Sequence, residues 1–142
     1  MVSVTRITEL DASPSTVWTL LTDTTAWPRY APVRSVEIER PGTTDPNGVG
    51  QIRAIETWAG TVREEVTEFE PEHRIGYELL SGAPVSDYRG TIVLEPAGAG
   101  TRYVWAIEFH ARWYLVPLLA VITKRTVSKT IRGLKAELRS RT

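Results

Sequence analysis

Glu64 and Arg53 are the two residues of this sequence best placed for acid–base chemistry. In the stretch 61–67 the residues of the same parity as Glu64 are valines, so Glu64 is the charged member of an apolar strand face. A carboxylate on such a face is costly unless it is paired. A turn near residues 58–60 would bring Arg53, or Gln51, of the preceding strand within reach of Glu64. We therefore expect a cross-strand ion pair.

Such a pair has two interpretations. As a functional group, Glu64 held against Arg53 would serve as a general base or as a hydrogen-bond anchor for a ligand hydroxyl or carbonyl. Arg53, Tyr77 or Tyr88 would then hold a developing oxyanion. As a structural group, the pair would only satisfy two charges, or Glu64 would point outward if the strand bulges. The sequence leaves both interpretations open.

Aromatic side chains are the candidate ligand contacts. Strand parity places Tyr103, Trp105 and Phe109 on one face of the last strand, and Tyr77 and Tyr88 on the faces that converge with it. Ordinary core packing would point the same rings inward. A buried tyrosine hydroxyl needs a hydrogen-bond partner, which makes Tyr77 and Tyr88 the stronger candidates. Together with residues of two helices, the expected ligand contacts are Trp27, Tyr30, Tyr77, Tyr88, Tyr103, Trp105, Phe109, Leu119 and Ile122.

The composition excludes several kinds of chemistry. The sequence has no cysteine, which rules out disulfides, thiolate nucleophiles and cysteine-based zinc sites. Its two histidines, His73 and His110, lie far apart, so we expect no metal site, although carboxylates could bind an ion. By position and parity both histidines are expected on the surface. No phosphate loop, nucleophile elbow or dinucleotide fingerprint is present, and we expect no cofactor.

Charge is unevenly distributed although the formal net charge is zero. Residues 111–142 carry eight Lys or Arg against Glu137 alone, whereas residues 1–110 carry nine against sixteen acidic groups. This asymmetry could serve an anionic partner, or it could simply complement a helix dipole and an acidic sheet. Exposed aromatics are not interleaved with the charges, so we expect no nucleic-acid partner. A transient contact with an anionic membrane through the basic helix stays open.

The elements that must position these residues follow from periodicity and turn signals. Residues 2–10 predict a strand, Ser13 and Pro14 begin a short helix, and Asp23 caps a second one that Pro32 ends. Recurrent turn residues separate six further, mostly alternating stretches, and short connections make the seven strands antiparallel. These stretches are residues 33–40, 49–58, 61–69, 74–80, 86–95 and 101–111.

The last element is a long helix, predicted over residues 117–138. Its apolar stripe runs through Val127, Ile131 and Leu134, and its Lys and Arg residues lie mostly on the other side. Residues 115–122 are apolar nearly all the way round. We expect this first half to be buried on both faces beneath the two short helices. The alternative is that its second face meets a ligand, a partner or a membrane.

The order strand, two short helices, six strands and long helix is also the order of the helix-grip fold. The sequence resembles the START-like, or SRPBCC, superfamily, in particular its polyketide cyclase/dehydrase and lipid-transport branch. The matching segments fix caps, turns and packing rather than chemistry, so they are specific for fold and weak for activity. They are ASPSTVW (12–18), LTD (21–23), WP (27–28), GVG (48–50), REEVTEFEP (63–71) and the closing helix.

The resemblance implies one α+β helix-grip domain over residues 1–142, with a seven-stranded antiparallel sheet wrapped around the C-terminal helix. Between the two it implies a deep pocket for a small hydrophobic or aromatic molecule, lipid or polyketide-like, with Trp27 and Tyr30 over the mouth. Some members of the family cyclise or dehydrate polyketides, and many only bind, carry or sense. We expect ligand binding, with a cyclase or dehydrase that uses Glu64 as general base as the alternative. Without a signal segment or a membrane-spanning apolar run, we expect a cytoplasmic protein.

Overall fold

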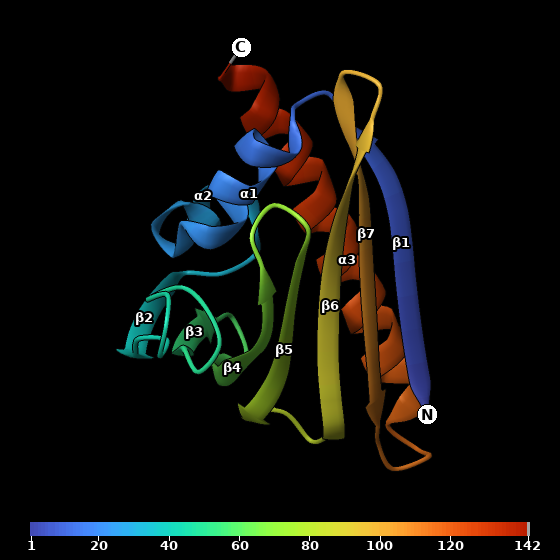
Figure 1. Cartoon of the computed structure of the whole chain (residues 1–142). Helices are drawn as coiled ribbons and strands as arrows, with labels where there is room; N and C mark the ends of the chain where they lie inside the picture. Colours follow the sequence, from blue (N-terminus) through green and yellow to red (C-terminus); the bar gives the residue numbers. More distant parts are fainter. Residues whose placement is uncertain (142) are drawn as a thin grey trace.

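The computed structural model describes residues 1–141, and its main feature is a curved antiparallel sheet that holds one long helix (Figure 1). The sheet has seven strands in the spatial order β1-β7-β6-β5-β4-β3-β2. The predicted order of elements is confirmed. In chain order they are β1 (Val2–Leu10), α1 (Pro14–Thr22), the 3-10 turn η1 (Thr24–Ala26), α2 (Trp27–Tyr30), β2 (Ser35–Arg40), β3 (Ile52–Thr57), β4 (Gly60–Glu70), β5 (Arg74–Ser81), β6 (Ser86–Ala97), β7 (Gly100–His110) and α3 (Val116–Ser140).

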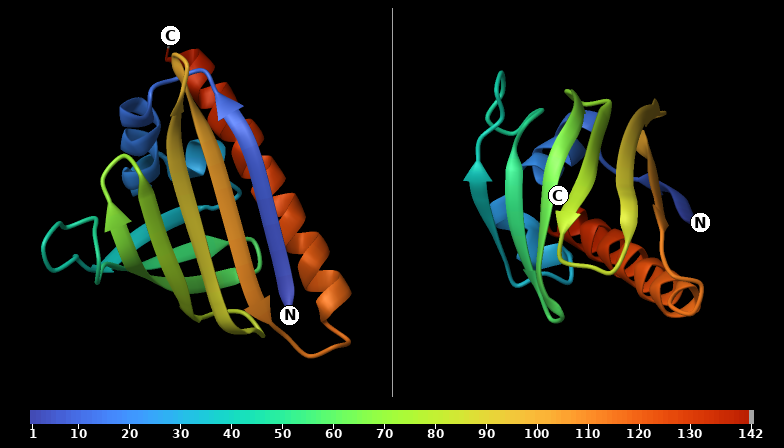
Figure 2. Two further views of the ribbon diagram at one scale, coloured as in Figure 1. Left: turned by 45° about the vertical axis from the view of Figure 1, so that its right-hand side comes forward. Right: turned by 90° about the horizontal axis from the view of Figure 1, so that it is seen from below.

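Register shifts bend the sheet around α3. They fall between β2 and β3, at two places between β4 and β5, and between β6 and β7. An extra residue on one strand of an antiparallel pair kinks that strand and increases its twist. Figure 2 shows the result from two sides, with α3 lying across the concave face of the sheet. Side chains on that face therefore point toward the helix.

The two short helices begin where the sequence places their caps. The Ser13 hydroxyl accepts a hydrogen bond from the Thr16 backbone N–H at 3.3 Å, and the Asp23 carboxylate accepts one from the Thr25 N–H at 3.1 Å. Each cap satisfies an N–H group that the first helical turn leaves without a partner. The second cap sets the direction of the chain into α2 and so positions Trp27.

The β3 strand starts later than predicted, at Ile52 rather than at residue 49. Gly50 adopts a positive φ of 94°, a conformation that belongs to turns rather than strands. Gln51 is buried, and its side-chain amide donates to the Pro46 carbonyl at 3.0 Å and to Asn47 Oδ1 at 3.3 Å. Gln51 therefore stabilises the β2–β3 loop and does not pair with Glu64.

The C-terminal half of α3 packs in the core, where Val127, Leu134 and Leu138 are buried. Here α2 lies against the helix so closely that a Cβ atom on Gly133 would stand 2.0 Å from the Tyr30 carbonyl oxygen. The close approach explains a glycine inside a long helix, where it otherwise costs about 1 kcal/mol. The short helices thus cover the far end of α3.

The expectation that the first half of α3 is buried on both faces is wrong. Leu118 is 58% exposed and Val121 is 49% exposed, while Leu119 and Ile122 are half-buried. The reason is the position of α2, which meets α3 at Gly133, about three turns beyond these residues. In the described residues no helix combines the length and the hydropathy needed to cross a bilayer.

Candidate ligand-binding site

Arg53 and Glu64 form the predicted ion pair. They are direct partners in the β3–β4 register, and the Arg53 Nε and Nη2 groups both donate to Glu64 Oε1, at 3.2 and 3.1 Å. The Arg53 side chain is 4% exposed and that of Glu64 is 13% exposed. The hairpin at Gly60 brings them together on the concave face, as the alternation of residues 61–67 indicates. The prediction of a cross-strand pair is confirmed.

Two aromatic rings enclose the Arg53 guanidinium. Its carbon lies 4.6 Å from the centre of the Trp27 ring and 5.7 Å from that of Tyr77. The indole Nε1 of Trp27 donates to the Leu21 carbonyl at 3.1 Å, which fixes the orientation of the ring. A guanidinium over an aromatic face gains electrostatic attraction as well as cover from water. Sequence reasoning placed Trp27 at a pocket mouth and missed this contact, because strand parity does not tell where a four-residue helix sits.

A second aromatic group continues the wall on β5, β6 and β7. The Trp105 Nε1 donates to the Tyr77 hydroxyl at 3.0 Å, and the ring of Tyr88 stacks on that of Phe109 with 5.4 Å between centres. Gly90 lies directly opposite Tyr77 in the β5–β6 register and leaves room for its ring. Four of the predicted contacts thus come together beside the ion pair.

Burial changes the acidity of this group. Loss of hydration raises the pKa of Glu64, and the charge and hydrogen bonds of Arg53 act against that rise. Burial also raises the pKa of Tyr77 and of Tyr88, and the Glu64 carboxylate adds to both shifts. The two phenols are therefore neutral hydrogen-bond donors at neutral pH. Glu64 is a carboxylate whose proton affinity is increased.

One oxygen of Glu64 is left for other partners. Both Arg53 hydrogen bonds end on Oε1, and within residues 1–141 no donor bonds to Oε2. No buried polar side-chain atom in that part of the chain lacks a partner, so Oε2 keeps some contact with solvent in a side chain that is 13% exposed. An accessible carboxylate oxygen beside neutral phenols can accept a hydrogen bond from a hydroxyl, or a proton.

The other predicted contacts lie around this centre. Tyr30 is buried, and its hydroxyl donates to the Leu20 carbonyl at 3.0 Å, so it joins α1 and α2. Tyr103 is 1% exposed and meets Trp105 edge to face at 6.4 Å. Leu119 packs against the core from α3, and Ile122 is half-buried on the same helix. Nothing places Leu119 or Ile122 in contact with Arg53 or Glu64.

The rings of the site are only partly covered. Trp27, Tyr88 and Trp105 are half-buried although they face the concave side of the sheet. The cause is the position of α3, which packs most closely on α2 and on β1 rather than on the central strands. Solvent therefore reaches the middle of the concave face.

Two hollows on the surface of residues 1–141 lie away from this aromatic group and are not lined by it. One, of about 310 Å³, lies on the outer face of α3. The other, of about 200 Å³, lies over β1, β6 and β7. Neither is the deep pocket implied by the resemblance. In this conformation the rings of the site contact one another.

Metal ligands do not gather anywhere in the described part of the chain, residues 1–141. His73 and His110 are both exposed, as their positions in the sequence predict. Glu64 has a guanidinium as its neighbour, which is the opposite of the oxygen-rich surroundings that a hard cation prefers. The site is thus a carboxylate, a guanidinium and a set of rings.

A curved seven-stranded antiparallel sheet around one long C-terminal helix defines the α+β helix-grip fold of START-type proteins. The protein belongs to the family described as polyketide cyclase / dehydrase and lipid transport, which matches residues 1–139. A comparison with curated proteins found no match.

Solved structures confirm the fold. A START superfamily protein from Mycobacterium smegmatis is 16% identical, with a TM-score of 0.85 over 99% of both chains. The Zhui aromatase/cyclase from a Streptomyces species is 19% identical, with a TM-score of 0.84 over 99% of this chain and 94% of the other. A protein from Thermus thermophilus is 22% identical, with a TM-score of 0.76 over 99% of both chains. At these sequence identities the structural similarity shows the fold alone.

Proposed function

We propose that this protein binds a small hydrophobic or aromatic molecule between the sheet and α3, and that the Arg53–Glu64 pair anchors a polar group of that molecule. The observation that supports this most directly is the accessible Oε2 of Glu64, at the base of a wall of half-buried rings. Apolar walls with few polar groups are typical of small-molecule sites. The family description, which includes lipid transport, agrees with such a role.

The chemistry of the wall limits what would bind. Trp27, Tyr88, Trp105 and Phe109 offer ring faces and edges, which favour flat, apolar ligands. Glu64 Oε2 accepts a hydrogen bond, and the neutral hydroxyls of Tyr77 and Tyr88 can donate one. A ligand that matches all of these has a ring system or an acyl chain and at least one hydroxyl or carbonyl. Polyketides and hydroxylated lipids both fit this description.

Binding requires the rings to move apart. Tyr88 stacks on Phe109, and Trp27 covers Arg53, so a ligand must replace these contacts with its own. Trp27 comes from a helix of four residues, and such a short element is held mainly by tertiary contacts. We expect α2 and the β6 end near Tyr88 to shift when ligand enters.

A second candidate function is that of a polyketide cyclase or dehydrase. It is favoured by the raised pKa of Glu64, which makes this carboxylate a stronger base than usual, and by the family description. In the first step Oε2 would remove the proton between two carbonyls of a poly-ketone. The electron pair of the C–H bond moves onto a carbonyl oxygen, which accepts hydrogen bonds from Tyr77 or Tyr88.

Native mass spectrometry of the protein purified from its host tests the binding function. We expect a retained apolar molecule of defined mass, and an unliganded protein that also binds nothing in a broad library of aromatic and lipid compounds would contradict it. Glu64→Gln should lower the affinity for hydroxylated ligands more than the affinity for analogues without the hydroxyl. Glu65→Gln is the matched control, because Glu65 is the next residue and pairs with Arg40 at 3.8 Å instead.

The same variants test catalysis separately. With a poly-ketone that the wild type converts, Glu64→Gln should abolish product formation while the substrate still binds. Unchanged turnover in Glu64→Gln would remove Glu64 from the mechanism and leave the binding function intact. The cytoplasmic location expected from the sequence stays a prediction.

A further inference from the structure

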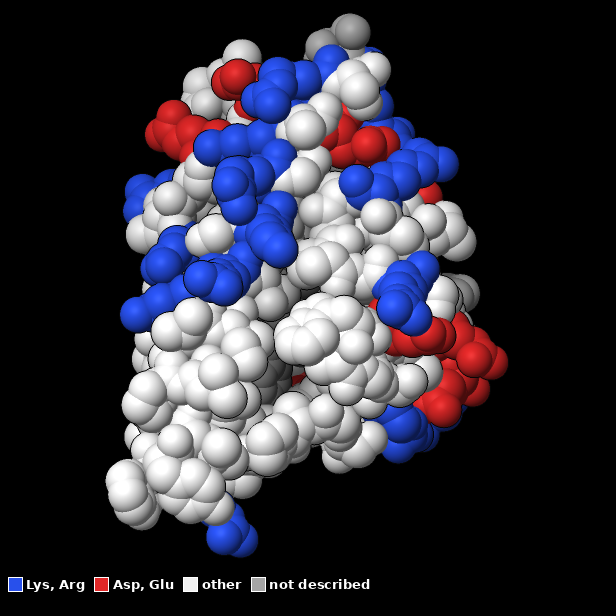
Figure 3. All heavy atoms as spheres, turned by 180° about the vertical axis from the view of Figure 1, so that it is seen from behind, with Lys and Arg blue, Asp and Glu red and all other residues white. Residues whose placement is uncertain are grey.

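The loop before α3 and the first turns of the helix expose four large apolar side chains. Trp113 is 84% exposed, Tyr114 55%, Leu118 58% and Val121 49%. The rings of Trp113 and Tyr114 meet edge to face at 5.7 Å, so they form one unit. Exposed apolar residues that occur singly need no explanation, but a cluster of four at one end of a helix marks a surface for contact. Figure 3 shows a largely uncharged region on the lower part of this face, with a basic side chain at its lower edge.

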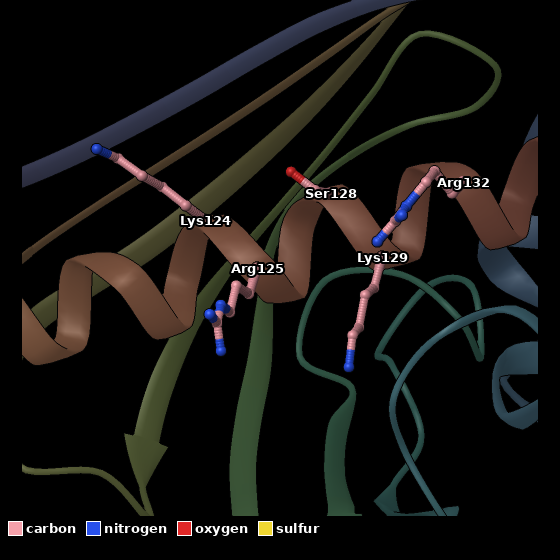
Figure 4. A pocket seen from close by; sticks show the side chains of 5 residues that line it. All are labelled: Lys124, Arg125, Ser128, Lys129 and Arg132. Atoms are coloured by element: carbon pink, nitrogen blue, oxygen red, sulfur yellow. The ribbon is translucent and has the colours of Figure 1, made fainter.

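The same side of α3 continues into a row of cations. Arg125, Lys129 and Arg132 follow Val121 at helical spacing, away from the buried stripe through Val127 and Leu134, and Lys124 flanks this row and points to the other side of the helix, as Figure 4 shows. With Ser128 these four line the hollow of about 310 Å³ on the outer face of the helix (Figure 4). Figure 3 shows them as part of a basic band directly beside the uncharged region.

These four cations are not neutralised by the protein itself. Within residues 1–141 none of them makes an ion pair or a hydrogen bond through its side chain. On the sheet the opposite holds, since Arg63 pairs with Glu39 at 2.6 Å and Arg89 pairs with Glu108. The acidic groups of the sheet therefore do not pair with the four cations of α3, and these cations are available to an external anion.

We infer that this surface docks on an anionic phospholipid bilayer. The apolar end would enter the headgroup region, and the basic row would lie over the lipid phosphates. The inference rests on exposure and charge alone and is independent of the proposed ligand-binding function. We call the surface the docking face; its residues are Trp113, Tyr114, Leu118, Val121, Lys124, Arg125, Lys129 and Arg132.

The composition of the docking face favours a bilayer over other anionic or apolar partners. Trp and Tyr are enriched at membrane interfaces, where one side of the ring is apolar and the other is wet. Nucleic acid offers no partner for the aliphatic side chains of Leu118 and Val121. A second copy placed face to face would set the four cations either against those of its partner or against the partner's apolar end, and in neither arrangement would they meet an anion. Lipid headgroups above acyl chains satisfy both halves of the docking face together.

Flotation with vesicles tests the charged half. We expect binding to vesicles of phosphatidylcholine with about one third phosphatidylglycerol, and little binding to phosphatidylcholine alone. Because each basic side chain near the surface contributes about fivefold, Lys124→Gln/Arg125→Gln should lower partitioning about thirtyfold. The control Arg63→Gln/Arg102→Gln removes the same amount of charge from the outer face of the sheet. It should lower the partitioning onto vesicles much less. Equal losses in the two variants would overturn the inference.

A pair of tryptophan variants tests the apolar half. Trp113→Ala should reduce partitioning about tenfold, whereas Trp58→Ala should not, although Trp58 is also 74% exposed, in the β3–β4 turn. The blue shift of tryptophan emission on vesicle addition should disappear only in Trp113→Ala. The inference is overturned if Trp113→Ala binds vesicles as the wild type does. It is equally overturned if the docking face is found to mediate a dimer in solution that does not bind anionic vesicles.

Discussion

Arg53 donates two hydrogen bonds to a single oxygen of Glu64 across the β3–β4 pair, at 3.2 and 3.1 Å, and the other carboxylate oxygen has no donor among residues 1–141. A buried ion pair is an expensive way to hold a sheet together, because desolvation offsets most of the attraction between the charges. Two apolar residues would serve the fold as well. The one-sided geometry therefore supports the proposal that Glu64 Oε2 anchors a ligand.

Replacing Arg53 should destabilise the protein strongly. Arg53→Met keeps the volume but leaves Glu64 as an unpaired charge next to Tyr77, which should lower the free energy of unfolding by about 3 kcal/mol at neutral pH. Urea unfolding followed by circular dichroism measures the effect. The double variant Arg53→Met/Glu64→Leu should recover most of the loss. If the double variant is no more stable than Arg53→Met, the ion pair is not the source of the effect.

The contribution of Glu64 to stability should depend on pH in a definite direction. Burial raises the pKa of Glu64 in the folded state above its usual value of 4.5, so the folded protein holds this proton more tightly than the unfolded chain. The contribution of Glu64 to the free energy of unfolding is fully present below pH 4.5 and is lost as the pH rises through the folded-state pKa. The free energy of unfolding of the wild type should therefore fall relative to that of Glu64→Gln as the pH rises. A difference that is flat with pH, or that shifts the other way, would contradict the assigned burial.

The sequence predicts the secondary-structure elements and the Arg53–Glu64 ion pair because both depend on local periodicity. Alternation in residues 61–67 and a turn near Gly60 are enough to set Arg53 opposite Glu64, and a hairpin allows few other registers. The caps at Ser13 and Asp23 are equally local, since each concerns one turn of helix. Predictions of this kind need no knowledge of distant contacts.

What the sequence does not predict is how the helices lie on the sheet. The cover that Trp27 gives to Arg53, and the exposure of Leu118 and Val121, both depend on where α2 meets α3. That position is set by Gly133, a lone glycine in a helix, which the periodicity of α3 gives no reason to select. The sequence signal that could have located the α2–α3 contact is the glycine itself, because a glycine inside a helical pattern often marks a close approach of another backbone.

Alkaline pH should unfold the protein through its buried phenols. Burial raises the pKa of Tyr30, Tyr77, Tyr88 and Tyr103 above the value of 10.0 that each has in an unfolded chain. Above pH 10.0 the unfolded chain releases protons that the folded one keeps, so stability should fall as the pH rises. Absorbance at the tyrosinate band should increase together with unfolding, in one transition. Ionisation of these four phenols well before the loss of circular dichroism would contradict their burial.

The wall of the site depends on the absence of a side chain at Gly90. A Cβ atom there would lie 2.3 Å from the Tyr77 hydroxyl oxygen, so Gly90→Ala must displace that ring and break its hydrogen bond with Trp105. We expect a loss of about 2 kcal/mol in unfolding free energy from overpacking, and weaker binding of any ligand that contacts Tyr77. Calorimetric titration and urea unfolding measure the two effects.

Gly76→Ala on β5 is the control for Gly90→Ala, because it is also a strand glycine on a buried stretch of the sheet. Its added Cβ would meet Glu68 Cβ, Cγ and Cδ at 3.1, 3.2 and 3.3 Å, so β4 need give by only a few tenths of an ångström while the exposed end of the Glu68 side chain turns away. The cost in stability should be below about 1 kcal/mol, with ligand affinity unchanged. If both variants lose affinity to the same extent, Tyr77 is not part of the binding wall and the effect belongs to the sheet as a whole.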